Sequence, residues 1–428
     1  MRSKCSWKAL LPSLVFVTLI FPFVTITFLL PVEYSDSPTS DNIGVAGTAV
    51  TTNSTTAGAS TESNVCLTPS CIQNVASSLA RAYPDKTNQS AWILTSKNGY
   101  HIGNKTIAGI IYVKNFKAAS STAAGIALRI AHRHGDNHGQ EPAWVKFSHV
   151  RGFKYAQRDP QHSLLITSLR DPAARSLSRI FYTSITQKGE SPTDDNLLQK
   201  LRWNHRQYGA VSHEGGGYQV RYCSMKKDLE ESWSPTQPHM VIKPEMVRQN
   251  VYDIIHAYDF ILVAERMDES IVALAMILGL PLADVLVMDA KQNLGQEYLY
   301  FALHDRKSNR KVETCRLSIR AFRSPAVQAH LESMEWFAKN YGDYLLHAAA
   351  MSSLDLTIER LGRERFHSML QQYQHLKAKS RHLCANETLS HCSNTGNVQR
   401  HLSEKNCYLD DSGCGYACID RMLANEPE

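Results

Sequence analysis

Hydrophobic positions along this chain form short apolar runs, each followed by a helical pattern. The runs Ile110–Val113 and Leu164–Leu169 have the length and composition of buried strands. The pattern of Ala123–His134 predicts a helix after the first run. Asp171-Pro172, a good N-cap followed by a proline suited to the first helical position, predicts a helix after the second. Such strand–helix units predict an α/β fold with a central, mainly parallel sheet flanked by helices.

A lysine and three hydroxyl side chains lie between the first predicted strand and its helix. Lys117 supplies a positive charge, while Ser120, Ser121 and Thr122 add hydrogen-bond donors to the N–H groups that attract an anion at a helix start. The nucleotide-triphosphatase pattern G-x-x-x-x-G-K-S/T is absent, because the lysine precedes the hydroxyls and the loop has no glycine. The segment therefore predicts phosphate binding and disfavours an ATPase.

The hexapeptide Lys117-Ala118-Ala119-Ser120-Ser121-Thr122 resembles the 5′-phosphosulfate loop of Golgi carbohydrate sulfotransferases, whose donor is 3′-phosphoadenosine 5′-phosphosulfate (PAPS). The same families carry a 3′-phosphate motif: an arginine ends a strand, Asp-Pro or Glu-Pro follows, and a serine lies eight residues after the arginine. Arg170 and Ser178 occupy these positions. The resemblance implies that all eight residues bind PAPS, in a P-loop-like sulfotransferase fold with the donor phosphates at the carboxyl ends of the strands.

The segment Tyr258–Ser270 narrows the resemblance. It is similar to the galactose-3-O-sulfotransferase family, in which a strand ends in a glutamate, here Glu265, and a turn with Asp-Glu-Ser leads into a helix. Cys407–Asp420 resembles the cysteine-rich end of that family, so the likeness spans roughly residues 100 to 420. Phe116 departs from the pattern, since the family often has histidine there. The resemblance implies sulfation of a carbohydrate hydroxyl, most simply the 3-hydroxyl of a terminal β-galactose on a glycolipid or glycoprotein.

Sulfuryl transfer needs a cation at the bridging oxygen of the leaving phosphate and a base for the acceptor hydroxyl. Lys117 is the predicted cation. His149 is the predicted base, because an imidazole has a suitable pKa and because related 2-O- and 3-O-sulfotransferases place a catalytic histidine between the two nucleotide motifs. His132, His134 and Glu265 remain alternatives. The expected mechanism requires no metal.

The N-terminal region predicts membrane attachment. Leu10–Pro31 has no charged residue and is long enough to cross a hydrocarbon core of about 30 Å. Basic residues precede it, so the positive-inside rule predicts a type II protein with a cytosolic tail at residues 1–9 and a retained transmembrane signal anchor at 10–31. A cleaved signal peptide is the alternative, but no clear small-x-small site follows. Residues 32–65, rich in Ser and Thr, predict a flexible stem before a lumenal domain at 66–428.

Cysteines and glycosylation sequons agree with a lumenal location in the Golgi. Cys5 is cytosolic in this topology, which leaves nine cysteines in an oxidising compartment, several of them in a cysteine-rich subdomain at residues 384–420. An odd number leaves one thiol that is either unpaired or bridges two chains, so a homodimer stays open. The absence of a Cys-x-x-Cys pair disfavours zinc. Four sequons follow the anchor, at Asn53, Asn88, Asn104 and Asn386.

The charge of the chain limits its partners. Without the three lysines and arginines of the tail, 43 of the 46 basic residues remain against 40 acidic ones, a lumenal net charge of +3. This excess is too small to indicate nucleic-acid binding, and it suits one basic cleft for an anionic nucleotide. Arg175 and Arg179 could widen that cleft, although a solvated helix face is their expected place.

Two other classes remain open. A lumenal type II glycosyltransferase would share the anchor, stem, sequons and disulfides, although this chain has no Asp-x-Asp motif for a metal-bound nucleotide. A non-catalytic glycan-binding protein with a sulfotransferase fold is the other alternative, because Phe116 departs from the family pattern and the base is not fixed by sequence.

Overall fold

The structure is a computed structural model. It describes residues 68–81, 109–137, 145–160, 163–202, 217–227, 244–288, 297–305, 310–385, 391–399 and 414–425, all of them within one compact unit, Glu62–Glu428. The predicted tail, anchor and stem and all four sequons lie outside these residues. Within the described ranges no helix combines the length and the apolar character that a membrane span requires.

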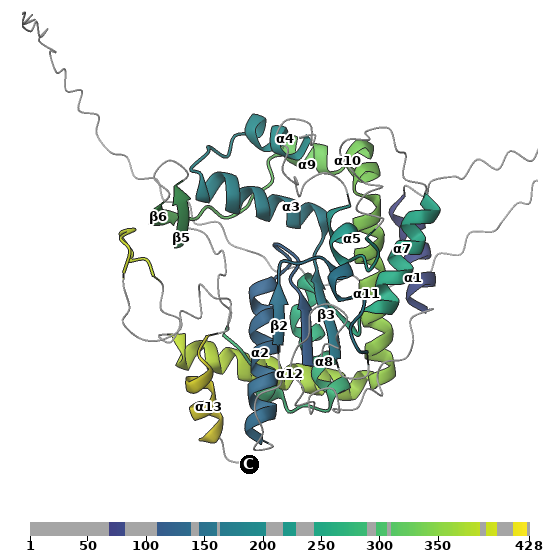
Figure 1. Ribbon diagram of the computed structural model, residues 1–428, viewed down its shortest axis with the longest axis vertical. Helices are drawn as coiled ribbons and strands as arrows, with labels where there is room; N and C mark the ends of the chain where they lie inside the picture. Colours follow the sequence, from purple (N-terminus) through teal and green to yellow (C-terminus); the bar gives the residue numbers. More distant parts are fainter. Residues whose placement is uncertain are drawn as a thin grey trace, which may run out of the picture. The chain divides into compact units, whose positions relative to one another are not determined.

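A parallel sheet forms the centre of this unit (Figure 1). Its 4 strands lie in the order β2 (Val145–Ser148), β1 (Gly109–Val113), β3 (Ser163–Leu169) and β4 (Phe260–Val263), and every neighbouring pair is parallel. Every residue of β1 and β3 is buried, as expected for strands covered on both faces. The predicted α/β class, with a parallel sheet flanked by helices, is confirmed.

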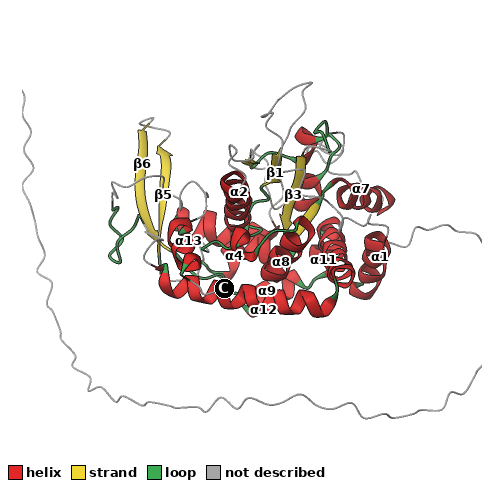
Figure 2. Ribbon diagram, turned by 90° about the horizontal axis from the view of Figure 1, so that it is seen from below, coloured by secondary structure: helices red, strands yellow, loops and turns green. Residues whose placement is uncertain are grey.

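Helices cover this sheet. α2 (Ser120–Asn137) packs on β1 and β2, whereas α8 (Met267–Leu278) and α11 (Tyr341–Leu361) pack on β4. In Figure 1 and Figure 2, α11 lies on the side away from α2, together with α7 (Pro244–Ala257) and α1 (Pro69–Arg81). Further helical segments in this part are α5 (Tyr218–Cys223), α12 (Arg363–Leu383), α13 (Tyr416–Ala424), η2 (Gly152–Tyr155), η5 (Ala264–Arg266) and η6 (Leu282–Val285).

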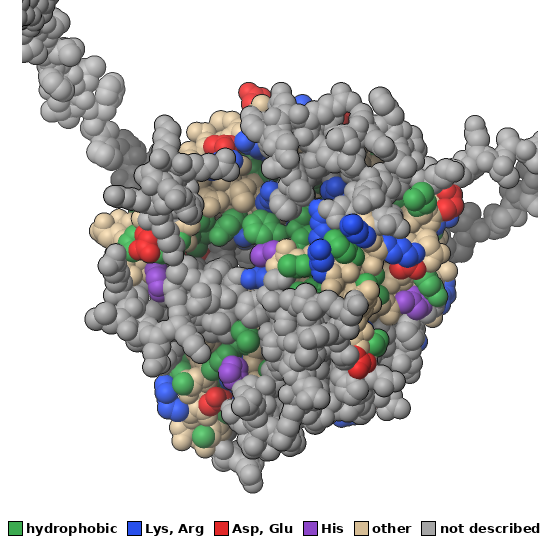
Figure 3. All heavy atoms as spheres, viewed as in Figure 1, with side chains coloured by type: hydrophobic (Ala, Val, Ile, Leu, Met, Phe, Trp, Pro, Cys, Tyr) green, Lys and Arg blue, Asp and Glu red, His purple; other side chains and the backbone are tan. Residues whose placement is uncertain are grey.

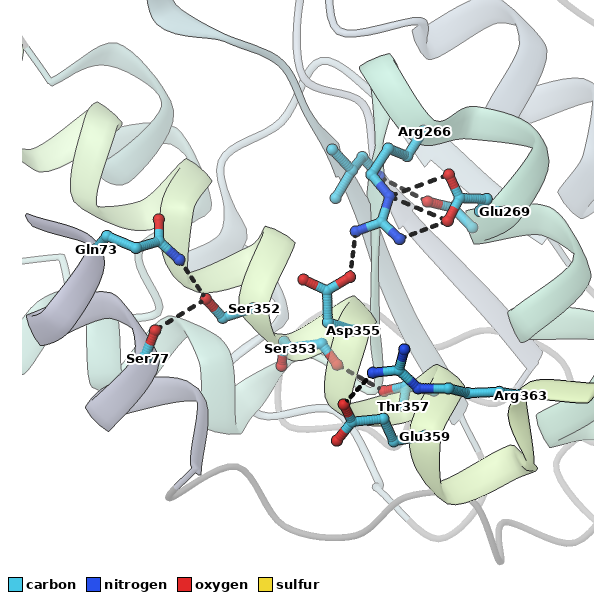
Figure 4. Close-up of polar contacts among 12 residues, drawn as sticks. Gln73, Ser77, Arg266, Glu269, Ser352, Ser353, Asp355, Thr357, Glu359 and Arg363 are labelled. Atoms are coloured by element: carbon cyan, nitrogen blue, oxygen red, sulfur yellow. Dashed lines mark hydrogen bonds and ion pairs between the residues drawn. The ribbon is translucent and has the colours of Figure 1, made fainter. Parts of the chain in front are cut away.

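Polar contacts attach α1 and the start of α8 to α11 (Figure 4). Gln73 Nε2 of α1 donates to Ser352 Oγ of α11 over 3.1 Å. Arg266, the last residue of η5, donates from Nη1 to Asp355 Oδ1 of α11 over 2.5 Å and from Nε to the carboxylate of Glu269 over 3.1 Å. The ion pair with Asp355 holds the turn between β4 and α8 against α11. This turn also carries Glu265, one of the alternatives for the base.

A second hydrophobic cluster lies beside the sheet core. It is formed by α3 (Pro172–Ile180), the π-helix η3 (Phe181–Gln187), α4 (Asp194–Arg202), α9 (Pro325–Leu331) and α10 (Met334–Lys339), which lie in the upper part of Figure 1. Large side chains such as Phe181 and Trp336 are buried in it. Because only two residues separate the end of β3 from the start of α3, this layer adjoins the carboxyl edge of the sheet.

An antiparallel hairpin forms a separate sheet that the sequence pattern did not predict. Its strands are β5 (Tyr298–Asp305) and β6 (Arg310–Leu317). A disulfide joins Cys315 on β6 to Cys392.

Further disulfides hold the C-terminal region together. Cys384, at the end of α12, is bonded to Cys418 of α13, and Cys414 is also disulfide-bonded. Near the start of the unit, Cys71 of α1 is disulfide-bonded as well. Such bonds persist in the oxidising compartments of the secretory pathway and are rare in the cytosol. Among the described residues the free cysteine is Cys223, which is buried. The unpaired thiol left open by the sequence therefore lies inside the fold.

Candidate functional site

The loop between β1 and α2 has a strained backbone. Lys117 and Ala119 have φ angles of 63° and 55°, in the left-handed region that residues other than glycine rarely adopt. A left-handed residue next to helical ones, as at Ala119, turns successive N–H groups into a concavity that suits an anion. The first turn of α2 contains no acidic residue. This geometry fits the predicted phosphate-binding loop.

α2 begins three residues earlier than its apolar pattern predicts. The helix starts at Ser120 rather than Ala123, so Ser120, Ser121 and Thr122 lie in its first turn and not in a loop before it. Serine and threonine favour helix starts because their hydroxyls bond to local backbone groups, which explains why an apolar pattern placed the start too late. The three side chains are half-buried. An anion at this helix end would meet hydroxyls and backbone donors together.

The start of α3 agrees with its prediction. Asp171 is the N-cap, its Oδ1 accepts a hydrogen bond of 2.8 Å from the N–H of Ala174, and Pro172 is the first helical residue. Arg170 lies between β3 and this cap, with 34% of its side chain exposed. Burial lowers the pKa of its guanidinium while the nearby carboxylates raise it, and an arginine so placed remains charged at neutral pH. Ser178 lies within α3 and is half-buried.

The fold brings together the two segments for which the sequence predicts phosphate binding. β1 and β3 are neighbouring parallel strands, so the segments that follow them meet at the same edge of the sheet. Arg170 Nη1 donates to the carbonyl oxygen of Lys117 over 3.3 Å, although 53 residues separate them. Lys117 and Arg170, predicted from separate stretches of sequence, therefore lie next to each other at one edge of the sheet.

Gln219 links these two segments and was missed by sequence reasoning. Its side chain is fully buried on α5. Gln219 Oε1 accepts from the N–H of Arg170 over 3.0 Å, and Nε2 donates to the carbonyl of Arg170 over 2.7 Å. Asn115 Nδ2, after β1, donates to the same Oε1 over 3.4 Å. A single glutamine in a short helix carries no sequence signal, because its role depends entirely on its neighbours in space.

His149 directly follows β2 and is exposed. Its Nδ1 lies 2.7 Å from the carbonyl oxygen of Lys114. Because a carbonyl oxygen only accepts hydrogen bonds, Nδ1 must carry the hydrogen, and Nε2 is the acceptor of the neutral ring. A general base needs an acceptor nitrogen held in a fixed orientation, and this contact provides it.

An aromatic cluster connects the predicted base with the predicted cation. The ring centroids of Phe116 and His149 lie 5.5 Å apart, and those of Phe116 and Tyr182 lie 6.2 Å apart. Lys117 Nζ lies 4.1 Å from the centroid of Tyr182. Phe116, where the family pattern often has histidine, is therefore the ring that joins His149 to the surroundings of Lys117.

The alternative histidines lie far from the loop. His132 and His134 are twelve and fourteen residues after the start of α2. At a rise of about 1.5 Å per residue they lie about 18 Å and 21 Å along the helix axis from Ser120. Both positions are therefore distant from the end of the helix at which an anion would bind.

Glu265 accepts hydrogen bonds from two other segments of the fold. Its Oε1 accepts from the N–H of Asp171 over 3.0 Å, and its Oε2 lies 3.1 Å from His347 Nε2 of α11. Burial raises the pKa of the Glu265 carboxyl, but the hydrogen bonds from His347 and Asp171 outweigh it and hold the pKa below its usual value. A carboxylate with a lowered pKa is a weaker proton acceptor. The position of His347, on a distant helix, was not foreseen either.

The expectation of a solvated helix face is wrong for Arg175. This side chain is 1% exposed, and its Cζ lies 4.2 Å from the ring centroid of Tyr218, because this side of α3 faces α5 rather than water. Burial raises the pKa of Asp343, and the charge of Arg175 opposes that shift. Arg179 is half-buried with its Cζ 5.8 Å from the Phe116 ring, so it adds positive charge beside the aromatic cluster.

Basic, histidine and hydrophobic side chains border a hollow in the face shown in Figure 3. In the part of the chain that the structure describes, no group of three or more His, Cys, Asp or Glu side chains could hold a metal ion.

Comparisons with protein-family models, with curated proteins and with solved structures found no match to this chain. Evidence on function therefore comes from the residues and their geometry.

Proposed function

We propose that this protein transfers a sulfuryl group from PAPS to a carbohydrate hydroxyl. The observation that carries this proposal is the contact between Arg170 Nη1 and the Lys117 carbonyl, which unites a lysine–hydroxyl loop and an arginine–serine motif at one sheet edge. PAPS carries anionic groups on its 5′ and 3′ sides. Two adjacent basic segments, one ending in a helix start with hydroxyls, match this pair of charges.

Each residue then has a defined role. The first turn of α2 with Ser120, Ser121 and Thr122 binds the 5′-phosphate, and Arg170 with Ser178 binds the 3′-phosphate. Lys117 neutralises the charge that grows on the bridging oxygen of the leaving phosphate.

The reaction is an in-line displacement at sulfur. A bond forms between sulfur and the acceptor oxygen while the bond between sulfur and the bridging phosphate oxygen breaks. The acceptor proton goes to His149 Nε2, and adenosine 3′,5′-bisphosphate leaves. The residues supply position, positive charge and one base, so the proposed chemistry uses no metal.

The proposed acceptor is the 3-hydroxyl of a terminal β-galactose on a glycolipid or glycoprotein. The proposed location is the Golgi membrane, with a single type II anchor and a lumenal catalytic domain. The disulfides of the described part support an oxidising compartment of the secretory pathway. Membrane attachment rests on the sequence pattern of residues 10–31 alone.

Binding followed by turnover tests the proposal. The full-length protein, expressed in animal cells and solubilised in detergent, should bind adenosine 3′,5′-bisphosphate at least tenfold more tightly than adenosine 5′-monophosphate, because only the former engages Arg170 and Ser178. With ³⁵S-labelled PAPS and an array of glycans, label should appear on terminal β-galactosides. Binding of UDP-sugars without bisphosphate binding would instead indicate a glycosyltransferase. Bisphosphate binding without transfer to any glycan would indicate a non-catalytic homologue.

A further inference from the structure

α3 does not end where its α-helical pattern ends but continues as a π-helix. The π-helical segment η3 covers Phe181–Gln187 and directly follows Ile180. π-helices are rare, usually a single turn, and occur frequently at functional sites because they redirect a side chain from the regular helical register. Phe181, Ser184, Ile185 and Thr186 are buried in the layer beside the sheet, which leaves Tyr182 half-buried on the side of the donor loop.

The Tyr182 ring is fixed by aromatic neighbours. Its centroid lies 5.4 Å from that of Phe301 on β5 and 6.2 Å from that of Phe116 in the donor loop. Phe301 is 5% exposed, so it anchors the ring from the hairpin side. Two segments distant in the sequence, β5 and the loop before α2, thus pack against the tyrosine ring.

The held ring lies under the ammonium group of Lys117. The distance of 4.1 Å from Nζ to the ring centroid is within the range of about 6 Å over which a cation is attracted to an aromatic face. A lysine side chain has a flexible four-carbon stem, and its compact charge does not fix its own direction. The left-handed backbone of Lys117 sets only where the stem begins. The contact with the Tyr182 ring limits where the charge lies.

We propose that Tyr182 is a positioning residue that holds the Lys117 ammonium at the donor loop before the donor binds. The π-helical register of η3 is what places the ring there. The role of Lys117 in transfer rests on the proposed function, whereas the contact between ring and ammonium does not. Tyr182 acts through Lys117 and is not itself assigned a contact with the donor.

The test compares variants with and without a ring at position 182. Tyr182→Phe keeps the aromatic face, and Tyr182→Leu and Tyr182→Met remove it at similar volume. In the full-length protein, the rate at which acetic anhydride modifies Lys117 at fixed pH is measured by mass spectrometry. Lys200 of α4, which pairs with Glu190, is the internal reference. Loss of the ring should raise the relative rate for Lys117 about two- to fivefold, since a cation–π contact favours the protonated amine. Tyr182→Phe should leave it unchanged.

Turnover supplies the second readout. Both ring-free variants should lower kcat about five- to thirtyfold while the Kd of adenosine 3′,5′-bisphosphate changes less than threefold, because the bisphosphate lacks the sulfuryl group whose transfer Lys117 assists. Tyr182→Phe should restore kcat to within about threefold. In a Lys117→Met background, loss of the ring should have no further effect on kcat, since coupled residues are not additive. Gln187→Leu, in the same π-helix, controls for disturbance of the segment.

Several results would overturn the inference. Equal labelling and equal kcat for Tyr182→Leu and wild type would show that the ring does not hold the lysine. Equal losses for Tyr182→Phe and Tyr182→Leu would assign the effect to the hydroxyl. If either Tyr182→Leu or Tyr182→Met fails to fold, the labelling rate and kcat of the other variant test the inference. Should the wild-type protein neither bind bisphosphate nor transfer sulfate, the proposed function fails, while the labelling of Lys117 still tests the positioning contact.

Discussion

The helices α2 and α3 both follow strands of the parallel sheet closely, yet their N-termini differ. α3 is closed by Asp171, whose carboxylate accepts from the N–H of Ala174 and whose own N–H donates to Glu265. α2 instead begins with hydroxyl residues, has no acidic residue in its first turn and follows the left-handed Lys117 and Ala119. The positive end of the α3 dipole therefore already meets a carboxylate, whereas the first turn of α2 supplies none.

This difference indicates how the two ends would treat a phosphate. An anion at the start of α2 gains from the helix dipole, from N–H groups and from Lys117. An anion at the start of α3 would be repelled by Asp171, so a phosphate held by Arg170 must lie along the flank of α3, toward Ser178. Under the proposed function, the first end handles the reacting 5′-phosphosulfate and the second only recognises the 3′-phosphate. Substitutions at the two ends should then differ in kind.

The largest effect is expected from Lys117→Ala, at the α2 end. Loss of a cation that acts in the transition state should lower kcat by about 10³- to 10⁵-fold, the range known for cations that assist phosphoryl transfer. Affinity for adenosine 3′,5′-bisphosphate, measured by calorimetry, should change by no more than about tenfold. Lys114 is a poor control because it is only 5% exposed and its carbonyl contacts His149. Lys154, exposed on η2, is the better control, and an equal loss in Lys154→Ala would reduce the loop to a general basic patch.

A slightly smaller effect is expected from His149→Ala. Removal of a general base should lower kcat by about 10²- to 10⁴-fold and leave bisphosphate affinity close to that of wild type. The pH dependence of kcat should also lose the limb that falls on the acidic side, because protonation of the imidazole no longer matters. A variant that keeps turnover within a few fold of wild type would transfer the role to another residue, and Glu265→Gln would be the next variant to assay.

A moderate effect is expected from Arg170→Ala, at the α3 end. Here the loss should appear in donor affinity, by at least about tenfold, because a charge-assisted contact contributes about 1.5 to 3 kcal/mol. The Kd values of adenosine 3′,5′-bisphosphate and adenosine 5′-monophosphate separate the two ends, since only the former should bind more weakly to the variant. An unchanged Kd in a folded variant would show that Arg170 does not bind the 3′-phosphate. The proposed difference between the α2 and α3 ends in phosphate binding would then be wrong.

The smallest effect is expected at Glu265, which secures the cap of α3. The pKa of its carboxyl is lowered in the folded protein, so ionised Glu265 adds stability above its unfolded pKa of about 4.3, and this stability is lost as the pH falls through the folded value. Glu265→Gln should therefore lower Tm near neutral pH, and the difference from wild type should shrink below about pH 4. A difference independent of pH would mean that ionisation of Glu265 contributes nothing to the fold.

The elements around the candidate site were largely predictable because their signals are local. β1 and β3 appear as apolar runs in the sequence. Asp171 caps α3 through a hydrogen bond within the first turn, and Pro172 suits the first helical position. The start of α2 was placed three residues late, since hydrophobic periodicity does not register polar residues in a first turn. A short-range pattern thus predicts an element better than it predicts its ends.

The groups that organise the site were not predictable, because each comes from a distant segment. Gln219 reaches Arg170 across 49 residues and His347 reaches Glu265 across 82. The π-helix that presents Tyr182 has no known compositional signature, and the burial of Arg175 depends on the packing of α5 against α3. Such contacts follow from the tertiary arrangement, which no window of sequence contains.

The buried thiol of Cys223 gives the protein an internal reporter of unfolding. Its sulfur lies 3.7 Å from Thr167 Oγ1 of β3, and burial raises its pKa to about 12. A buried thiol with a raised pKa carries little of the reactive thiolate at neutral pH, so the native state resists disulfide exchange at this position. A newly made chain lacks this protection, and its odd thiol can mispair until the sheet closes over it. Alkylation of Cys223 therefore measures how often the carboxyl edge of the sheet opens.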